Sequence, residues 1–229
     1  GVQTRMVQGR RVTDASAIDA TSMVLNGLIN TQLVALCRSF GISAIGIGGI
    51  DGGLVQAHRR APVTLASGEV VDYGMVGDID GIDGSVVTRL LDSGFLPVVS
   101  PLSCDYSGQL LNINADTVAA AIGGALVAEK LILCTGAPGI LERVDDPQSL
   151  ISYTDLAGLH RLREKGAITD GMLPKSSAIE AAIRGGVRRV HVISYAETDS
   201  LLAEIFTNEG KGTLVVADTK ALTAAEQGQ

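Results

Sequence analysis

The sequence predicts an α/β protein with a three-layer αβα sandwich built on a mostly parallel sheet. Two observations predict this class. Short apolar segments alternate along the chain with longer segments of helical periodicity. Aromatic residues make up only 3% of the 229 residues, whereas glycine contributes 28. The core must therefore pack from Val, Ile, Leu and Ala, which is typical of strands that are buried on both faces.

The first part of the chain predicts a long helix and a buried strand. An apolar-periodic segment runs from Asp14, a suitable N-cap, to Gly41, a suitable C-terminal glycine. It predicts one helix, or two helices joined near Gly27. A short buried strand at residues 43–47 and a glycine-rich loop at residues 48–53 follow.

Residues 54–82 have a different pattern. Short β-rich pieces are separated by Gly, Ser and charged residues, and residues 66–69 have the composition of a hairpin turn. We expect an antiparallel β-hairpin insert here.

After residue 82 the alternation resumes, and all 229 residues are expected to form a single domain. The expected helices are 84–92, 117–128, 155–164, 174–184 and 199–205, and the expected strands are 95–100, 110–113, 130–134, 187–193 and 213–216.

Composition excludes several classes of function. The formal net charge of −7 and the few aromatic side chains argue against a nucleic-acid surface. No run of about 18 uninterrupted apolar residues predicts a membrane span. Neither the cysteines nor the histidines have metal-ligand spacing, so we expect no metal site. The three cysteines are odd in number and far apart, so we expect reduced core or near-core thiols in a cytoplasmic protein. The cysteines and histidines are Cys37, Cys104, Cys134, His58, His160 and His191.

Ligands of open α/β sheets bind beyond the carboxyl ends of the strands. Four loops meet that rule here: residues 48–53, 100–116, 135–139 and 169–175. The loop at 135–139 has little side-chain bulk, so a ligand can approach its backbone, although it matches no known phosphate-binding fingerprint.

Three polar residues stand close together before the helix at 117–128. Asn112 and Asn114 lie two apart in an extended piece and share a face, and Asp116 follows in the first helical turn. Asn and Asp at a helix start are ordinary caps. The alternative is a polar cluster that binds a ligand and orients a lysine.

Lys175 follows Pro174 at the start of a predicted helix. A cation in the first turn opposes the helix dipole by about 0.3–1 kcal/mol, and a bound anion would remove that penalty. A solvated lysine and a functional lysine both remain open. Arg11, before the first helix, is a surface arginine or a partner for a carboxylate.

Five segments in this order resemble the amino-acid kinase superfamily, and within it the N-acetylglutamate kinases of arginine biosynthesis. They are GRRVT at 9–13, GFLPVVS at 94–100, NINAD at 112–116, ITDGMLPK at 168–175, and residues 206–213. The resemblance implies phosphoryl transfer from ATP, carried with Mg²⁺, to the side-chain carboxylate of N-acetyl-L-glutamate.

The resemblance also implies roles for single residues. Lys175 would neutralise charge on the moving phosphoryl group, and Asp116 would orient catalytic lysines. Arg11, Asn112 and Asn114 would bind the acceptor substrate, within a substrate half of about residues 1–120. Nucleotide contacts in the half at about 121–229 would come from Gly136, Ala137, Pro138, Gly139, Ile140, Leu141, Ala167, Ile168 and Thr169.

The sequence departs from the family pattern at three places. The family's first strand, with its lysine and glycines, and its His-Gly-Gly-Gly loop have no counterpart before Gly9, and the first lysine is Lys130. We therefore expect a domain that is incomplete at its amino terminus and inactive in this form. Gly136 and Ile50 stand where many members carry Asp and Lys, respectively.

Two other functions stay open: an arginine-sensing kinase-like regulatory domain, and a superfamily kinase for a different carboxylate or carbamate. The resemblance further implies a homo-oligomer, either a dimer or a hexamer. L-Arginine feedback through residues 204–212 is a related expectation.

Overall fold

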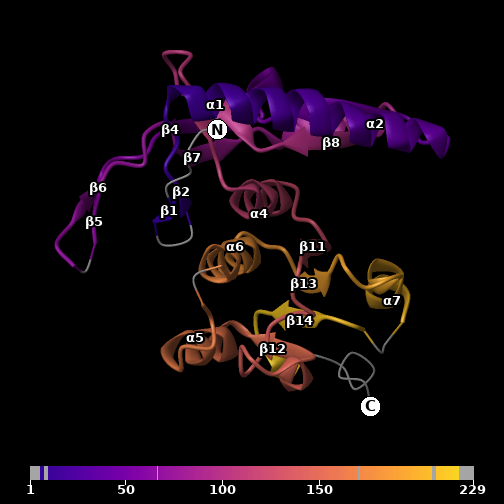
Figure 1. Ribbon diagram of the computed structural model, residues 1–229. Helices are drawn as coiled ribbons and strands as arrows, with labels where there is room; N and C mark the ends of the chain where they lie inside the picture. The colour runs from indigo at the N-terminus through magenta and orange to yellow at the C-terminus, as the bar shows by residue number, and fades with distance from the viewer. Residues whose placement is uncertain (1–5, 8–9, 66, 170, 208–209, 222–229) are drawn as a thin grey trace. The chain divides into compact units, whose positions relative to one another are not determined.

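The computed structural model describes residues 6–7, 10–65, 67–169, 171–207 and 210–221 (Figure 1). For Arg10, Arg11 and Ala221 it describes only the backbone. The chain divides into two compact units, residues 1–118 and 119–229, and each unit is described by itself.

A continuous helical run dominates the first unit. It comprises α1 (Ala15–Ser22), the π-helical segment η1 (Met23–Ile29) and α2 (Asn30–Ser39). Asp14 caps it by accepting a 2.8 Å hydrogen bond from the N–H of Ala17, as predicted. Gly41 follows its end with a φ of +74°, a conformation that favours glycine. Gly27 lies within η1, so the predicted junction is a π-helical segment rather than a break.

This helical run packs on two parallel strands, β3 (Ala44–Gly48) and β8 (Leu96–Ser100). The side-chain Nδ2 of Asn30 donates to the carbonyl oxygen of Val98 at 2.8 Å, and Asn26 accepts a hydrogen bond from Ser100. α3 (Gly84–Asp92) has the predicted bounds, with Asp83 as its N-cap.

The predicted antiparallel insert is present. β4 (Val55–Arg59) pairs antiparallel with β7 (Gly77–Ile82), and β5 (Val63–Thr64) pairs antiparallel with β6 (Val70–Val71). β4 also joins β9 (Leu102–Cys104), which pairs with β10 (Leu110–Asn112), so the sheet order is β10-β9-β4-β7. A further two-stranded sheet contains β1 (Met6–Val7) and β2 (Arg10–Arg11), and η2 (Asp51–Gly53) follows β3.

The second unit, which begins within α4 (Ala115–Ala125), is built on one four-stranded sheet. Its strand order is β11 (Lys130–Thr135), β13 (Arg189–Ser194), β14 (Thr213–Val216) and β12 (Tyr153–Asp155). The β11–β13 and β12–β14 pairs are parallel, whereas β14 runs antiparallel to β13. The α/β sandwich is therefore confirmed, with antiparallel pairs beside the parallel ones.

Helices α5 (Leu156–Glu164), α6 (Leu173–Arg184) and α7 (Ser200–Phe206) accompany this sheet, with the short turns η3 (Pro147–Ser149) and η4 (Thr219–Ala221). The core is aliphatic, as the composition predicts, and includes Leu133, Ile140, Leu159, Ile179, Val190, Val192 and Val215. All three cysteines are free thiols, but Cys134 is exposed rather than near-core. Its strand, β11, is at the edge of the sheet, which leaves the strand partly open to solvent.

Candidate active site

Asn112 is hydrogen-bonded to the segment that follows Arg11. Its side-chain Nδ2 donates to Oγ1 of Thr13 at 3.3 Å, and Thr13 is completely buried. The carbonyl oxygen of Met75 accepts from the Asn112 N–H at 2.8 Å, and the Met75 N–H donates to the Thr13 carbonyl at 2.7 Å. Met75 therefore links the end of β10 to residue 13.

Gly74 makes this junction possible. Its φ is +71°, and an added Cβ atom would lie 2.3 Å from the carbonyl oxygen of Thr13. Only glycine tolerates that conformation and that approach together. The sequence analysis did not single out this glycine, because its partner lies about 60 residues away along the chain.

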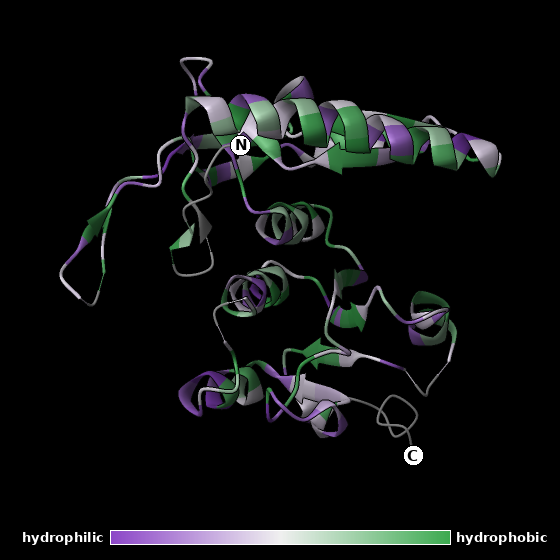
Figure 2. Ribbon diagram, in the orientation of Figure 1, coloured by the Kyte–Doolittle hydropathy of each residue, from purple (hydrophilic) through white to green (hydrophobic). Residues whose placement is uncertain are grey.

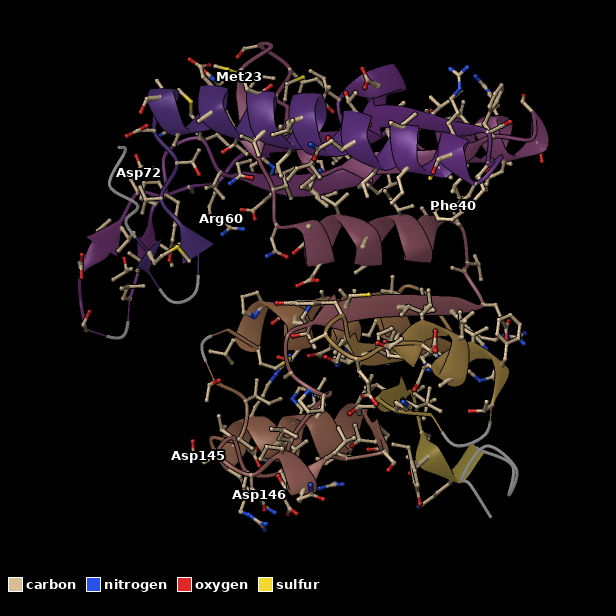
Figure 3. All side chains as sticks on the ribbon, turned by 45° about the vertical axis from the view of Figure 1, so that its right-hand side comes forward. Met23, Phe40, Arg60, Asp72, Asp145 and Asp146 are labelled. Atoms are coloured by element: carbon tan, nitrogen blue, oxygen red, sulfur yellow. The ribbon has the colours of Figure 1, made fainter. Side chains whose placement is uncertain are left out.

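Arg11 lies in β2, and its side chain is outside the described residues. Thr13, two positions further along the chain, is the nearest of the residues above whose side chain is described. A described cation also lies near this region. Arg60, labelled in Figure 3, directly follows β4, makes an ion pair with Asp78, and has its guanidinium 5.8 Å from the ring centroid of Tyr73.

Asn114 caps α4. Its Oδ1 accepts hydrogen bonds from the N–H of Thr117 at 3.1 Å and from its hydroxyl at 3.3 Å, which confirms the capping interpretation. Capping uses the amide oxygen, so the amide nitrogen is still able to donate a hydrogen bond to a ligand. Asp116 is half-buried in the first turn of α4.

Backbone N–H groups of the glycine-rich loop at residues 48–53 are hydrogen-bonded within the first unit. The Asp51 carboxylate accepts from the Gly48 N–H at 2.7 Å, and the N–H groups of Gly49 and Ile50 donate to strand carbonyls at 3.0 Å. These three N–H groups already have partners, so they do not form an anion-binding nest.

In the second unit, the predicted nucleotide loop begins where two parallel strands end together. Thr135 at the end of β11 pairs with Ser194 at the end of β13. An added Cβ at Gly136 would lie 3.1 Å from the hydroxyl oxygen of Tyr195, whose residue is 74% exposed. Tyr195 is thus an accessible aromatic ring beside the loop, and the sequence analysis missed it because it depends on the strand pairing.

The rest of this loop turns into the core. An added Cβ at Gly139 would meet Thr213 Oγ1 and Leu150 Cδ1 at 2.7 Å. The Ile140 N–H donates to Thr213 Oγ1 at 2.8 Å, and Ile140 is 1% exposed. Ala137, Pro138 and Leu141 are half-buried. The Ile140 carbonyl oxygen accepts from the Ile151 N–H at 2.9 Å, so both backbone groups of Ile140 have partners and this residue belongs to the core.

The second predicted nucleotide segment leads into α6. Ala167 is half-buried and Ile168 is buried in the core, whereas Thr169 is exposed. The Thr169 carbonyl accepts from the N–H groups of Met172 and Leu173 at 2.8 and 2.9 Å. Asp170, part of the recognised motif, lies outside the described residues.

Lys175 is buried in the first turn of α6, with 8% of the residue exposed. This excludes the fully solvated lysine that the sequence left open. At a helix N-terminus, the helix dipole and the ammonium group both favour an anion.

The sequence pattern of the amino acid kinase family matches residues 1–194. The chain belongs to the amino acid kinase family. It is 44% identical over 227 residues to the acetylglutamate kinase of Myxococcus xanthus, covering 97% of this chain and 74% of that protein. It is 42% identical over 218 residues to the acetylglutamate kinase of Archaeoglobus fulgidus, covering 94% and 75%.

Solved structures of the amino acid kinase fold agree. N-acetylglutamate synthase from Neisseria gonorrhoeae, complexed with coenzyme A and N-acetyl-glutamate, superposes with a TM-score of 0.80 at 26% identity. The match covers 95% of this chain and 47% of that chain. The same synthase complexed with coenzyme A and L-arginine gives a TM-score of 0.72 at 25% identity, covering 95% and 50%.

Among the described residues of this family member, no group of three His, Cys, Asp or Glu side chains could hold a metal ion. The histidines instead pair with carboxylates. His58 contacts Asp80 at 2.6 Å on the surface, and His160 contacts Glu180 at 3.4 Å. The buried His191 contacts Glu204 at 2.7 Å.

Proposed function

We propose that this chain carries the acetylglutamate kinase reaction, in which ATP phosphorylates the side-chain carboxylate of N-acetyl-L-glutamate in arginine biosynthesis. The observation that carries the proposal is the identity of 44% over 97% of the chain to a kinase with that name. The buried Lys175 at the start of α6 supports it, because a phosphoryl group in transit is an anion.

The acceptor is already a carboxylate, so the reaction needs positioning and charge neutralisation rather than a strong base. We propose that Arg11 binds a carboxylate of N-acetyl-L-glutamate, and that Asn112 and Asn114 bind its polar backbone end. The hydrogen bond from Asn112 to Thr13 supports a shared site, since Thr13 lies two residues after Arg11.

We further propose that residues 1–120 supply the acceptor site and residues 121–229 the nucleotide site. Mg²⁺ would arrive with ATP as part of the substrate. Backbone groups of residues 136–141 and 167–169 would hold the nucleotide, and the exposed ring of Tyr195 beside Gly136 would add a stacking surface. The three free thiols support a cytoplasmic setting.

An enzyme-coupled assay of ADP release tests this function in the full-length protein, because the family's first strand and its His-Gly-Gly-Gly loop have no counterpart in these 229 residues. We expect ADP release that depends on N-acetyl-L-glutamate and is at least tenfold lower with L-glutamate or N-acetyl-L-aspartate. Equal rates with all three acceptors, or no release above the uncatalysed level, would contradict the proposal.

The second candidate, an arginine-sensing domain without kinase activity, is supported by the similarity to the N-acetylglutamate synthase complexed with L-arginine. The higher identity to kinases, 44% against 25%, favours the enzyme. If Lys175→Ala has no effect on any activity and the protein binds L-arginine, the sensor is favoured instead.

We also propose that L-arginine regulates this kinase through the segment 204–212, of which residues 208 and 209 lie outside the described part. Glu204 is buried, and its second oxygen accepts from the Gly212 N–H at 3.0 Å. An added Cβ at Gly210 would lie 2.5 Å from that carboxylate. The other oxygen of Glu204 contacts His191 at 2.7 Å, so Glu204 would fix the shape of this segment rather than contact L-arginine itself.

Inhibition by L-arginine tests this proposal. We expect L-arginine to lower the kinase rate of the wild-type chain and to lose at least tenfold in potency against Glu204→Gln. Inhibition of equal potency in both chains would place the regulatory site elsewhere.

Finally, we propose a homo-oligomer that includes a dimer formed through the helical run 15–39. Its exposed apolar residues include Ile29, Leu33 and Leu36, and the exposed Phe40 directly follows the run. Figure 2 shows the hydrophobic residues recurring along this helix. Among the described residues this is the one helix long and apolar enough, by length and composition alone, to cross a membrane. The bonds of Asn26 and Asn30 to strands favour a surface helix and a protein partner.

A further inference from the structure

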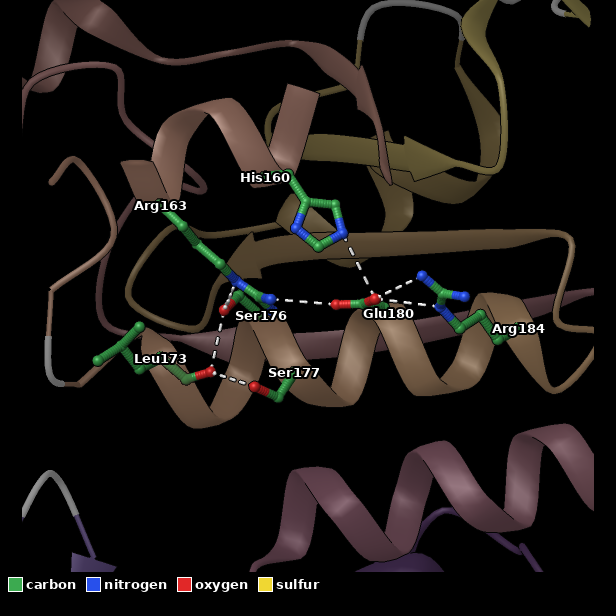
Figure 4. Close-up of polar contacts among 7 residues, drawn as sticks. All are labelled: His160, Arg163, Leu173, Ser176, Ser177, Glu180 and Arg184. Carbon is green, nitrogen blue, oxygen red and sulfur yellow. Dashed lines mark hydrogen bonds and ion pairs between the residues drawn. The ribbon is translucent and has the colours of Figure 1, made fainter. Parts of the chain in front are cut away.

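Arg163 connects α5 to the first turn of α6. Its Nε donates to Oγ of Ser176 at 3.1 Å, and its Nη1 donates to Oε2 of Glu180 at 3.0 Å (Figure 4). Its third nitrogen, Nη2, is buried without a hydrogen-bond partner among the described residues. An arginine held in this way loses hydration at one nitrogen, which costs stability.

Ser176 links Arg163 to the backbone of the first turn of α6, which carries Lys175. Its hydroxyl accepts from Arg163 and therefore donates its own hydrogen to the carbonyl oxygen of Leu173, at 2.9 Å. Ser177 donates to the same carbonyl at 3.1 Å. Ser176 is completely buried and is the direct neighbour of Lys175. The hydrogen bonds thus run from Arg163 through Ser176 to the first residue of α6.

Glu180 holds the other side of the guanidinium. It accepts hydrogen bonds from Arg163 and, at 2.8 and 3.0 Å, from Arg184, and it lies 3.4 Å from Nε2 of His160. Burial would raise the pKa of Glu180, but the hydrogen bonds from Arg184 and Arg163, with the charges of His160 and Arg163, hold it below its ordinary value. The carboxylate is therefore ionised at neutral pH and anchors Arg163.

We infer that Arg163 is a positioning residue for the reaction: through Ser176 it fixes the first turn of α6 and thereby the ammonium group of Lys175. This inference rests on the proposed kinase function. A misplacement of about 1 Å in a catalytic group can cost roughly 10²-fold in rate. Loss of Arg163 should therefore lower kcat without an equal effect on substrate binding.

The variants Arg163→Ala and Ser176→Ala, made in the full chain, test this inference. Arg184→Ala is the matched control, because it removes a second arginine from the same Glu180 but leaves the contact of Arg163 with Ser176 intact. We expect each test variant to lower kcat about 10- to 100-fold, with KM for both substrates within threefold of wild type. Arg184→Ala should stay within twofold in kcat.

The double variant separates positioning from general damage. Because both residues act in one chain of hydrogen bonds, Arg163→Ala and Ser176→Ala together should lower kcat no more than about twofold beyond either alone. Multiplicative losses, or an equal loss in Arg184→Ala, would overturn the inference. If Arg163→Ala does not fold, Ser176→Ala still decides, since a kcat within twofold of wild type would also overturn it.

Hydrogen exchange of the amides of residues 173 and 175–177 tests the positioning apart from the activity. Faster exchange in Arg163→Ala than in Arg184→Ala is expected, and equal exchange in the two would contradict the inference. A wild-type chain without kinase activity would defeat the proposed function, whereas the exchange result would still report on the fixed turn.

Discussion

Asn112 and Thr13 are 99 positions apart along the chain, yet the Nδ2 of Asn112 donates a hydrogen bond to Oγ1 of Thr13 at 3.3 Å. The contact joins the end of β10 to the segment that carries Arg11, the residue assigned to the acceptor carboxylate. This makes it the described contact that most directly supports one acceptor site in the first unit.

The first prediction concerns Asn112→Ala. Loss of one neutral hydrogen bond to the acceptor costs about 1 kcal/mol, so KM for N-acetyl-L-glutamate should rise roughly fivefold while KM for ATP is unchanged. Thr13→Val keeps the shape of residue 13 and removes only the acceptor oxygen, and it should have a smaller effect. Steady-state kinetics would refute the role of Asn112 if both substrates showed the same change.

The second prediction concerns Lys175→Ala. Removing one charge contact to a developing oxyanion costs about 2.7–4 kcal/mol, which corresponds to roughly 10²–10³ in kcat. KM should change little, because the contact strengthens in the transition state. A tenfold rise in KM at unchanged kcat would make Lys175 a binding residue only.

The third prediction concerns stability and pH at Glu204. Burial would raise its pKa, but the hydrogen bond and charge of His191 and the N–H groups of Gly212 and Lys211 hold the pKa below its ordinary value. A carboxyl group with a lowered pKa stabilises the fold above its unfolded pKa, and this contribution is lost as the pH falls through the folded pKa.

Glu204→Gln should therefore be less stable than wild type at pH 7, by about 1–3 kcal/mol, because the buried His191 loses its charged hydrogen-bond partner. The difference should shrink as the pH falls from the ordinary pKa of a glutamate, about 4.3, down through the lowered pKa of Glu204. Denaturant unfolding at several pH values measures it. A difference that does not change with pH would show that the charge of Glu204 does not matter.

The fourth prediction concerns the proposed dimer face. Leu36→Glu places a charge on the exposed apolar stripe of α2 and should convert a dimer to a monomer at micromolar concentration in analytical ultracentrifugation. Val70→Glu is the control, since Val70 is also apolar and exposed, at 64%, but lies on β6. A wild-type chain that is monomeric at all concentrations, or a Leu36→Glu chain that stays dimeric, would contradict the proposal.

Local sequence signals predicted much of the fold. The bounds of α3 and β14 agree with the expected residues 84–92 and 213–216, and Asp14 and Asn114 cap the helices as expected. Capping and helical periodicity depend on neighbours in the chain. The strands β9 and β12 were missed, because they have three residues each and depend on partners far away in the sequence.

At the candidate site too, features that depend on long-range packing could not be predicted. The residue types at 112–116 and 175 were visible in the sequence, but the burial of Lys175 was not. The chain of contacts from Arg163 to Ser176 was also invisible, since it depends on how α5 packs against α6. The residues that orient a catalytic group are therefore harder to predict than the group itself.

Trapping the product with hydroxylamine tests the central claim most directly. The full-length protein, rather than residues 1–229 alone, is incubated with MgATP, N-acetyl-L-glutamate and hydroxylamine. Mass spectrometry then measures the γ-hydroxamate of N-acetylglutamate, which forms only from an acyl phosphate. We predict ATP-dependent hydroxamate from the wild-type chain and at least 100-fold slower formation by Lys175→Ala. ADP release without hydroxamate, or equal hydroxamate from both chains, would contradict the assignment of this reaction to this site.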